Sequence, residues 1–599
     1  MTKERQFPSL VPTDPAKLAD ARRHLIEIAE KTKELTQVSV ERHQGGREIM
    51  PLDPTVMGRA FCEFTAGLLS NPVKLAEAQM KLWQDYAGIW QNLTRRALGE
   101  EVPPYVQPAP GDRRFKDDAW TNELVYDFLK QSYLVGSRWI QGLVAETPGV
   151  NERTRAEIQF LTRQYIDAIA PTNFVLTNPV VARKTMETGG ANLLAGMSNF
   201  LDDLTRNNAL VKNRAPETFK VGVNIAATPG SVIYQNDLMQ LIQYNPSTTD
   251  VSKTPILFVP PWVNKYYLFD LQPKNSFLKW LVDQGHTVFA ISWVNPGKQH
   301  RDKDFVDYMK EGPLAALDAI EQATGEREAH VVAYCLGGTL TATMLAWQAA
   351  RNDTRVKSAT LLATLTEFSD LGEFSVFFDE DRLLKLDRYL EKKGFLEGHD
   401  LARLFSIVRA NDLIWSAVVN NYLLAEESLP FDMTYWFADP AHMPAKMLNF
   451  YIRNIVFENR LPKPGQLVID GVPIDLGKIK TPTCFVSMHD DHVAPWRATY
   501  SGPHLFGGPT RFILGGSGHN AGIVNPPVAK KHGYWTNPEL PPAADDWLAG
   551  ATRHEGSWWS EWASWLAAAD DGKVPARMVG AGALKPLEAA PGSYVKVRA

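Results

Sequence analysis

The chain has 599 residues, which is too long for one hydrophobic core, so we expect more than one structural region. Its 63 basic residues nearly balance its 68 acidic residues, and this leaves no basic excess to attract nucleic acid. Three cysteines cannot build a disulfide framework, and they fit a reducing compartment.

The beginning of the chain carries no recognisable targeting signal. Residues 1–6 are followed by no apolar stretch of the kind that a secretory signal requires. No run approaches the ~18 apolar residues that are needed to cross a bilayer. We therefore expect a cytoplasmic protein without a transmembrane segment.

The first part of the chain is predicted to be helical. Apolar residues recur at steps near three and four within residues 73–98, which places them on one helix face: Leu75, Leu82, Tyr86, Ile89 and Leu93. The proline-rich residues 103–111 interrupt this pattern and predict a linker. A second helical stretch covers residues 120–204. We predict a helical N-terminal region over residues 1–215 that serves dimer, granule or partner contacts.

From about residue 218, short apolar runs alternate with helical segments. The expected strands cover residues 256–259, 286–293, 330–333, 359–365, 484–487 and 512–514. Strands that alternate with helices in this way are typical of a mainly parallel sheet covered on both faces. The sequence therefore predicts an α/β domain over residues 216–599.

This alternation stops between residues 366 and 480. The interval is rich in helix formers and aromatic residues, and a structureless loop of such length is implausible in a compact domain. We predict that it forms a cap subdomain, inserted over the carboxyl edge of the sheet.

A nucleophile-type residue follows the apolar strand that ends at Ala333. Cys335 lies between this strand and the glycines Gly337 and Gly338, which begin a helix. This strand–turn–helix context is that of the G-x-S-x-G elbow, with cysteine in the position of serine. The turn would direct the Leu336 N–H at an oxyanion, and the helix N-terminus would stabilise a thiolate. We predict a nucleophile at Cys335, and a buried structural cysteine is the alternative.

Two later loops carry the partners that a cysteine nucleophile needs. In α/β-hydrolases the acid precedes the histidine along the chain. Asp490 and Asp491 follow one predicted strand, and His519 follows the next strand within a run of small residues. We predict a triad of Cys335, His519 and one of these aspartates, which the order along the chain does not separate. His519 would take the thiol proton, and the aspartate would orient the imidazole.

The other histidines have weaker claims. His286 and His330 flank apolar strands, and we expect them to be structural. His489 and His492 bracket the acid, and we take His492 as a residue that shapes the site. No spacing of histidine, cysteine and acidic residues predicts a metal site, and no glycine-rich phosphate loop follows a strand. We therefore expect neither a metal nor a cofactor.

With these residues in view, the chain resembles the polyhydroxyalkanoate synthases, most closely the class I type that acts without a partner subunit. The resemblance spans nearly the whole chain. The motifs that carry it include Pro171-Thr172-Asn173-Phe174, Pro260-Pro261-Trp262-Val263-Asn264, Tyr334-Cys335-Leu336-Gly337-Gly338-Thr339, Asn411-Asp412-Leu413-Ile414-Trp415, Asp491-His492-Val493-Ala494-Pro495-Trp496 and Ser517-Gly518-His519. Two positions depart from the family pattern: Ala333 replaces a glycine, and Phe437 replaces an asparagine.

The resemblance implies polymerisation of (R)-3-hydroxyacyl-CoA, typically 3-hydroxybutyryl-CoA, into an intracellular polyester with release of CoA. It places the nucleophile on Cys335, the acid on Asp491 and the histidine on His519. Whether His519 or Asp491 activates the hydroxyl of the growing chain stays open. The resemblance also implies a homodimer at the surface of polyester granules, and CoA arrives on the substrate.

Several further residues are expected to hold the substrate. The Leu336 N–H should be one oxyanion donor, and the second should come from the loop after the strand at 256–259, around Trp262 and Val263. Within the shared motifs we name His492, Asp270 and Trp415 as additional positioning residues.

Two other functions compete with polymerisation. A cysteine hydrolase, such as a thioesterase or an intracellular polyester depolymerase, would share the same triad. A granule-coating protein without activity would share only the fold. The helical N-terminal region and the large cap favour the synthase over the hydrolase, and a complete triad in the expected order disfavours the coat protein.

Overall fold

The structure is a computed structural model that describes residues 54–109, 112–207, 218–426 and 431–599, with six residues between 20 and 31. It divides into two compact units, which we call the helical unit (residues 1–214 and 403–429) and the sheet unit (residues 215–402 and 430–599). The predicted domain boundary at 215/216, residues 1–6 and residues 110 and 111 of the predicted linker lie outside the described residues.

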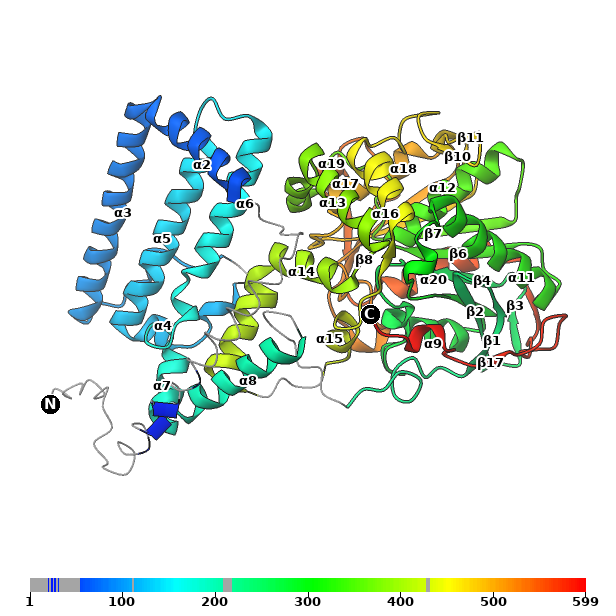
Figure 1. Ribbon diagram of the computed structural model, residues 1–599, viewed down its shortest axis with the longest axis horizontal. Coiled ribbons are helices and arrows are strands. Elements are labelled where there is room, and N and C mark those ends of the chain that lie inside the picture. The colour runs from blue at the N-terminus through cyan, green and yellow to red at the C-terminus, as the bar shows by residue number, and fades with distance from the viewer. Residues whose placement is uncertain are drawn as a thin grey trace. The chain divides into compact units, whose positions relative to one another are not determined.

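The helical unit begins with a group of helices of different lengths (Figure 1). They are α2 (Pro54–Leu69), α3 (Pro72–Ala97), α4 (Ala119–Asn122), α5 (Leu124–Glu146), α6 (Glu152–Ala168), α7 (Pro179–Thr188) and α8 (Ala191–Asn207). Ile89 and Leu93 of α3 are buried with Val135 of α5, and Leu82 and Tyr86 pack against this cluster. The apolar face that the sequence predicts within residues 73–98 is thus the face that α3 turns toward α5.

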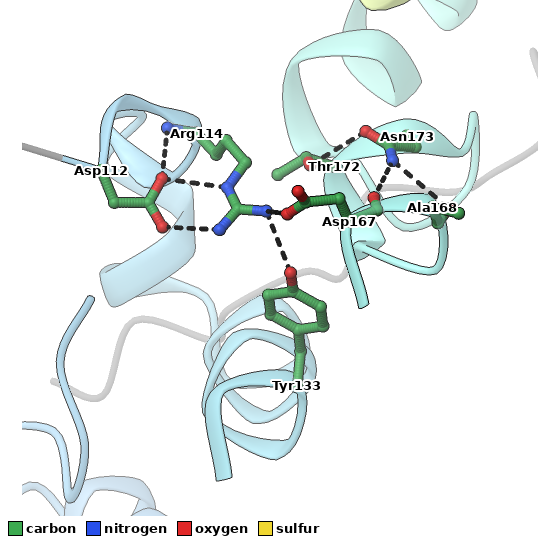
Figure 2. A network of polar contacts seen from close by, with 7 residues as sticks. All are labelled: Asp112, Arg114, Tyr133, Asp167, Ala168, Thr172 and Asn173. Atoms are coloured by element: carbon green, nitrogen blue, oxygen red, sulfur yellow. Dashed lines mark hydrogen bonds and ion pairs between the residues drawn. The ribbon is translucent and has the colours of Figure 1, made fainter. Parts of the chain in front are cut away.

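A polar network joins four elements of the helical unit, which are the short turns around Arg114 and Asn173 and the helices α5 and α6 (Figure 2). Arg114 donates from Nε and Nη2 to Asp112 at 3.0 and 2.9 Å. Its Nη1 donates to the Tyr133 hydroxyl at 2.9 Å and to the Asp167 carboxylate at 3.3 Å. Asn173 donates from Nδ2 to the Asp167 carbonyl at 2.7 Å. Asn173 belongs to the motif Pro171-Thr172-Asn173-Phe174, and its hydrogen bond attaches this motif to the C-terminal end of α6.

Part of the predicted cap insertion packs against α8. This part contains the π-helical turns η7 (Asn411–Trp415) and η8 (Val418–Leu423). The Asn192 side chain donates to the Leu423 carbonyl at 2.7 Å, and the Tyr422 hydroxyl donates to the Asp203 carboxylate at 3.0 Å. A Cβ on Gly196 would lie 1.8 Å from the Tyr422 carbonyl oxygen, so only glycine permits this approach. These contacts assign residues 403–426 to the helical unit.

The sheet unit is built on one large sheet of eleven strands, with the order β15-β14-β13-β12-β7-β6-β4-β5-β2-β1-β17. The strands are β1 (Gly230–Gln235), β2 (Met239–Tyr244), β4 (Ile256–Val259), β5 (Val288–Trp293), β6 (Ala329–Tyr334), β7 (Val356–Leu362), β12 (Thr483–Met488), β13 (Thr510–Gly515), β14 (Tyr534–Thr536), β15 (Thr552–His554) and β17 (Glu588–Ala589). The six strands from β5 to β13 in this order are parallel, and antiparallel strands flank them on both sides.

Helices cover this sheet, so the predicted fold class, a mainly parallel α/β sheet, is confirmed (Figure 1). They include α9 (Phe277–Asp283), α11 (Ala315–Thr324), α12 (Leu336–Ala350) and α20 (Trp558–Ala567). Trp558, Trp559 and Trp562 of α20 are fully buried, and their indole N–H groups donate to acceptors of the sheet unit at 2.8 to 3.0 Å. Buried indoles with satisfied N–H groups anchor this helix to the core.

The insertion between β7 and β12 supplies further helices to the sheet unit. They are α13 (Glu380–Lys393), the first part of α14 (Gly398–Val408), α15 (Asp432–Phe437), α16 (Ala445–Phe450) and the π-helical η9 (Tyr451–Phe457). Because β7 and β12 are neighbours and parallel, the chain leaves the sheet at its carboxyl edge before the insertion begins. The Ala441 N–H donates to the Val263 carbonyl at 3.0 Å, so the insertion contacts the loop that follows β4.

Across the described residues, no helix combines the length and apolar character that crossing a membrane requires.

Candidate active site

Cys335 occupies a strained turn between β6 and α12. Its backbone has φ 52° and ψ −120°, a conformation that costs a non-glycine residue about 1–3 kcal/mol. Its N–H donates to the Leu362 carbonyl of β7 at 2.9 Å, and its carbonyl accepts from the N–H groups of Gly338 and Thr339 at 2.9 and 3.2 Å. These bonds fix the turn, and the cysteine side chain stays partly exposed.

The two glycines after Cys335 allow α12 to lie close to the sheet. A Cβ on Gly337 would lie 2.4 Å from the Val259 carbonyl oxygen, and one on Gly338 would lie 1.9 Å from the Thr364 hydroxyl. Ala333, where the family has glycine, is fully buried in β6 and its methyl group is accommodated there. This departure therefore leaves the geometry of the turn intact.

The structure brings His519 and Asp491 together. The His519 Nδ1 lies 2.6 Å from Oδ2 of Asp491, and both residues are buried. The other carboxylate oxygen of Asp491 accepts the N–H groups of Val493 and Ala494 at 2.8 and 2.9 Å. Asp490, the competing acid, has an exposed side chain that pairs with His489 instead, at 2.7 Å. The geometry thus separates two aspartates that the sequence order does not.

Cys335 completes the cluster through His519. Burial on its own lowers the pKa of His519, but Asp491 and Cys335 outweigh burial and raise this pKa to about 10. Both partners act through their charge and through hydrogen bonds with the imidazole. The arrangement therefore stabilises a positively charged His519 between the Asp491 carboxylate and the Cys335 sulfur.

Tyr334 supports the histidine loop and was not anticipated from the sequence. Its buried hydroxyl donates to the Asn520 side chain at 2.7 Å, and its ring centroid lies 5.1 Å from that of His519. Tyr334, directly before Cys335, thereby fixes Asn520, directly after His519. Only its presence in the shared motif could have drawn attention to it.

The loop after β4 lies beside the elbow. Val259 is paired with Ala333 in neighbouring parallel strands, so both strands end at the same edge of the sheet. Trp262 follows in this loop, 2% exposed, and its indole N–H has no acceptor among the described residues. The Leu336 N–H likewise has none in the described part of the chain.

Tyr451 of the insertion also reaches this region, and the sequence interpretation missed it. Its ring packs edge-on against Trp262 with centroids 5.9 Å apart. Burial raises the pKa of Tyr451, nearby Cys335 raises it further, and a hydrogen bond to Thr339 opposes both. No local pattern marks this residue, because a π-helical turn far along the chain carries it.

The remaining positioning candidates have different surroundings. Asp270 is buried, and its carboxylate accepts hydrogen bonds from Ser276 at 2.7 Å and from the Thr228 hydroxyl. His492 lies half-buried directly after Asp491. Trp415 belongs to the helical unit, whereas the cysteine, histidine and aspartate cluster belongs to the sheet unit. Nowhere in the described residues do three or more histidine, cysteine or acidic side chains form a group that could hold a metal ion.

His330 lies at the start of β6, about 16 Å from Cys335 at 3.3 Å per residue of strand. Its Nδ1 lies 2.7 Å from the Ser358 hydroxyl. Burial lowers the pKa of His330 to about 4, and the neighbouring His286 lowers it further. Burial also lowers the pKa of His286. Both histidines are thus held neutral, away from the elbow.

This burial predicts an acid-sensitive fold. An unfolded histidine titrates near 6.5, so unfolding takes up a proton at His330 between about pH 6.5 and 4, which amounts to about 3 kcal/mol. The stabilisation is complete above about pH 6.5 and is lost as the pH falls toward about 4. Urea unfolding across this range should show a steeper pH slope for the natural chain than for His330→Gln. Replacement of the exposed His504 by Gln serves as the control, and equal slopes for the natural chain and His330→Gln would contradict the prediction.

Comparison with known proteins agrees with this architecture. The family model described as "alpha/beta hydrolase fold" matches residues 254–526, so the sheet unit has the α/β-hydrolase fold, here with a cysteine at the elbow. A second family model, "Poly-beta-hydroxybutyrate polymerase (PhaC) N-terminus", matches residues 111–281.

Curated relatives define the family more narrowly. A "Poly(3-hydroxyalkanoate) polymerase" of Methylorubrum extorquens is 44% identical over 91% of this chain and 90% of its own length. The "Poly(3-hydroxyalkanoate) polymerase subunit PhaC" of Rhizobium meliloti (strain 1021) is 44% identical over 89% and 87%. The protein of the same description from Cupriavidus necator (strain H16) is 39% identical over 89% and 90%. The chain belongs to the poly(3-hydroxyalkanoate) polymerase family.

Proposed function

We propose that this acyltransferase polymerises (R)-3-hydroxyacyl-CoA, with 3-hydroxybutyryl-CoA and other short-chain units as substrates, into polyhydroxyalkanoate and releases CoA. The observation that carries the proposal is the buried contact of His519 with Asp491, next to Cys335 at the elbow, in a chain of this family. Cys335 is the nucleophile, and each catalytic cycle passes through an acyl-Cys335 thioester.

The first step loads an acyl group onto Cys335. His519 takes the thiol proton of Cys335, and Asp491 stabilises the imidazolium that forms. The Cys335 thiolate attacks the thioester carbonyl, and the tetrahedral oxyanion collapses with cleavage of the bond to CoA. His519 then gives its proton to the departing CoA sulfur and becomes neutral.

The second step transfers the acyl group to a growing chain. The neutral His519 accepts the proton of the chain's 3-hydroxyl, whose oxygen attacks the acyl-Cys335 carbonyl. Asp491 is not placed to take this proton, because Val493, Ala494 and His519 already occupy its two carboxylate oxygens. We therefore assign the activation of the hydroxyl to His519. Cys335 leaves as a thiolate and the imidazolium forms again.

Cysteine suits this transfer better than serine. Exchange between the CoA thioester and the Cys335 thioester is nearly balanced in free energy, so the acyl-Cys335 intermediate is not too stable to react further. Attack by a hydroxyl then converts a thioester into an oxoester, which is downhill and drives elongation. A serine would make this second step an exchange between two oxoesters.

The oxyanion has donors on both sides of the elbow. The Leu336 N–H begins α12, where backbone N–H groups lack helical acceptors. The second oxyanion donor would come from the loop that contains Trp262 and Val263. The buried indole N–H of Trp262 has no acceptor among the described residues. A bound acyl-CoA carbonyl would supply one. Tyr451 and the rest of the insertion would keep water from the acyl-enzyme.

We further propose that the chain is of the class I type and acts as a homodimer in the cytoplasm, at the surface of polyester granules. The resemblance of its motifs to class I supports the proposed class and the homodimer. The polymeric product supports the proposed location at the granule surface. The polymer is insoluble, so an enzyme that stays bound to it must work at its surface.

Incubation with 3-hydroxybutyryl-CoA tests the proposed reaction. Release of CoA together with insoluble polyester is the expected result, because the acyl group passes to a hydroxyl. Release of CoA with free 3-hydroxybutyrate would instead identify a hydrolase with the same triad. Repeating the incubation with longer acyl chains measures the substrate range that the insertion permits.

A further inference from the structure

Tyr334 and Asn520 form a polar contact beside the cysteine and histidine of the site. Tyr334 is the last residue of β6, directly before Cys335, and is 2% exposed. Its hydroxyl donates to the Asn520 side-chain carbonyl at 2.7 Å and lies 3.4 Å from the His519 carbonyl oxygen. Its ring packs against Phe269 and His519, with centroids 5.0 and 5.1 Å away. One side chain thus contacts the ring and the backbone of the histidine and the residue that follows it.

We infer that Tyr334 and Asn520 are positioning residues, which keep His519 in place after Cys335 has been acylated. We call them the positioning pair. The inference rests on the proposed reaction, since it concerns the second step of that reaction. The pair does not itself exchange protons with the substrate, because the Tyr334 hydroxyl is occupied by Asn520. Burial raises the pKa of Tyr334 well above its ordinary value, and Cys335 and Asp491 raise it further, so the hydroxyl remains a neutral donor.

The two steps of the reaction leave His519 with different partners. In the free enzyme, Asp491 lies at Nδ1 of the imidazole, and the Cys335 sulfur is a second hydrogen-bond partner. Acylation removes this second partner, because a thioester sulfur carries no proton and accepts hydrogen bonds weakly. At this stage His519 has to take the proton of the 3-hydroxyl of the growing chain. Its position then depends on Asp491 and on the contacts with Tyr334.

The backbone around His519 makes these contacts important. The loop is built of small residues on both sides of the histidine: Ser517, Gly518, Ala521 and Gly522. Glycines leave the backbone more freedom than other residues do. Within the described residues, no backbone N–H donates to the His519 carbonyl, and the Tyr334 hydroxyl is the donor near it. The Asn520 carbonyl accepts from the Val524 N–H at 2.9 Å, so this residue joins the more ordered part of the loop to Tyr334.

Tyr334→Phe should therefore slow the second step and spare the first. The change removes the hydroxyl but keeps the ring. A misplacement of about 1 Å in a reacting group costs about 100-fold in rate, so we expect elongation to slow at least about 10-fold. Loading should stay within about 2-fold of the natural rate, because Cys335 still holds His519 during that step.

Rapid-quench incubation with 3-hydroxybutyryl-CoA separates the two steps. The initial burst of CoA release reports loading, and the steady rate that follows reports elongation. Mass spectrometry of the quenched protein should show more acyl-Cys335 in Tyr334→Phe than in the natural chain. A burst and a steady rate that fall by the same factor would indicate a general loss of structure and would overturn the inference. An unchanged steady rate would overturn it as well.

Tyr500→Phe is the matched control. Tyr500 is also 2% exposed in the sheet unit, and its hydroxyl donates to the Pro541 carbonyl at 2.6 Å. The substitution removes the same group and one buried hydrogen bond, but away from the histidine loop. It should leave the ratio of the burst to the steady rate unchanged. If Tyr500→Phe changed this ratio as much as Tyr334→Phe does, the inference would be wrong.

A double variant tests whether the two residues act as one unit. Asn520→Leu should slow elongation in the same way, because the buried Tyr334 hydroxyl loses its acceptor. Tyr334→Phe combined with Asn520→Leu should be no slower than the slower single variant, since neither polar group is then left without its partner. Losses that multiply would show that the two side chains act independently and would overturn the pair.

The proposed reaction and the positioning pair fail in different samples. Free 3-hydroxybutyrate in place of polyester from the natural chain would overturn the proposed reaction. The positioning pair is tested by the ratio of the two rates in the variants relative to the natural chain, whichever hydroxyl receives the acyl group.

Discussion

Replacing Cys335 by alanine should abolish polymerisation, with a loss of at least about 10⁴-fold in the rate of CoA release. The thiolate forms the only covalent link to the acyl group in the proposed cycle, so no other step can compensate. CoA release from 3-hydroxybutyryl-CoA measures the rate, and mass spectrometry of the quenched enzyme should lose the acyl adduct.

The chain offers its own control for this substitution. Cys62 is exposed and lies in the helical unit, so Cys62→Ala should leave the rate unchanged. Cys335→Ser gives a second comparison, since an acyl-serine would lose the downhill step to the oxoester. Polymer formation by Cys335→Ala at the natural rate would contradict the assignment of Cys335 as the nucleophile, and a natural chain that releases no CoA would indicate a granule-coating protein.

Asp491→Asn should have the second largest effect, a loss of roughly 10⁴-fold, because the carboxylate orients and charges the histidine. Without the anion, the pKa of His519 falls and the imidazolium that accompanies the thiolate is lost at neutral pH. The pH dependence of iodoacetamide alkylation at Cys335 reports this change separately from turnover. Alkylation should set in at higher pH in the variant than in the natural chain.

Asp490→Asn is the matched control for this prediction. The two aspartates are adjacent, but Asp490 is exposed and pairs with His489, so its loss should change the rate less than about 2-fold. Equal losses at both positions would show that the local loop, and not the contact with His519, governs activity.

The elbow was predictable from the sequence because its determinants are local. An apolar strand, a cysteine and two glycines within nine residues leave little choice of backbone, and the structure forms the turn at Cys335. Parallel strands end at one edge, so the loops with Asp491 and His519 could be predicted to meet there. The choice between Asp490 and Asp491 was not accessible from the residues alone, because it depends on which side chain accepts from Val493 and Ala494.

Residues brought in from the insertion could not be predicted in the same way. Tyr451 comes near Cys335 through tertiary packing of a π-helical turn, and no spacing in the sequence encodes that approach. The sequence also did not show that residues 403–426 pack against α8 of the helical unit. An apolar helical pattern shows that a segment is buried, but it does not show which unit buries it.

The packing of residues 403–426 on α8 has a practical consequence for protein engineering. The helical unit is not a removable N-terminal piece, because the chain returns to it after the sheet has begun. A truncation at residue 215 would strip α8 from Tyr422 and Leu423 and leave their apolar surroundings open to water. Exchange of this unit between relatives should therefore transfer both stretches of sequence together.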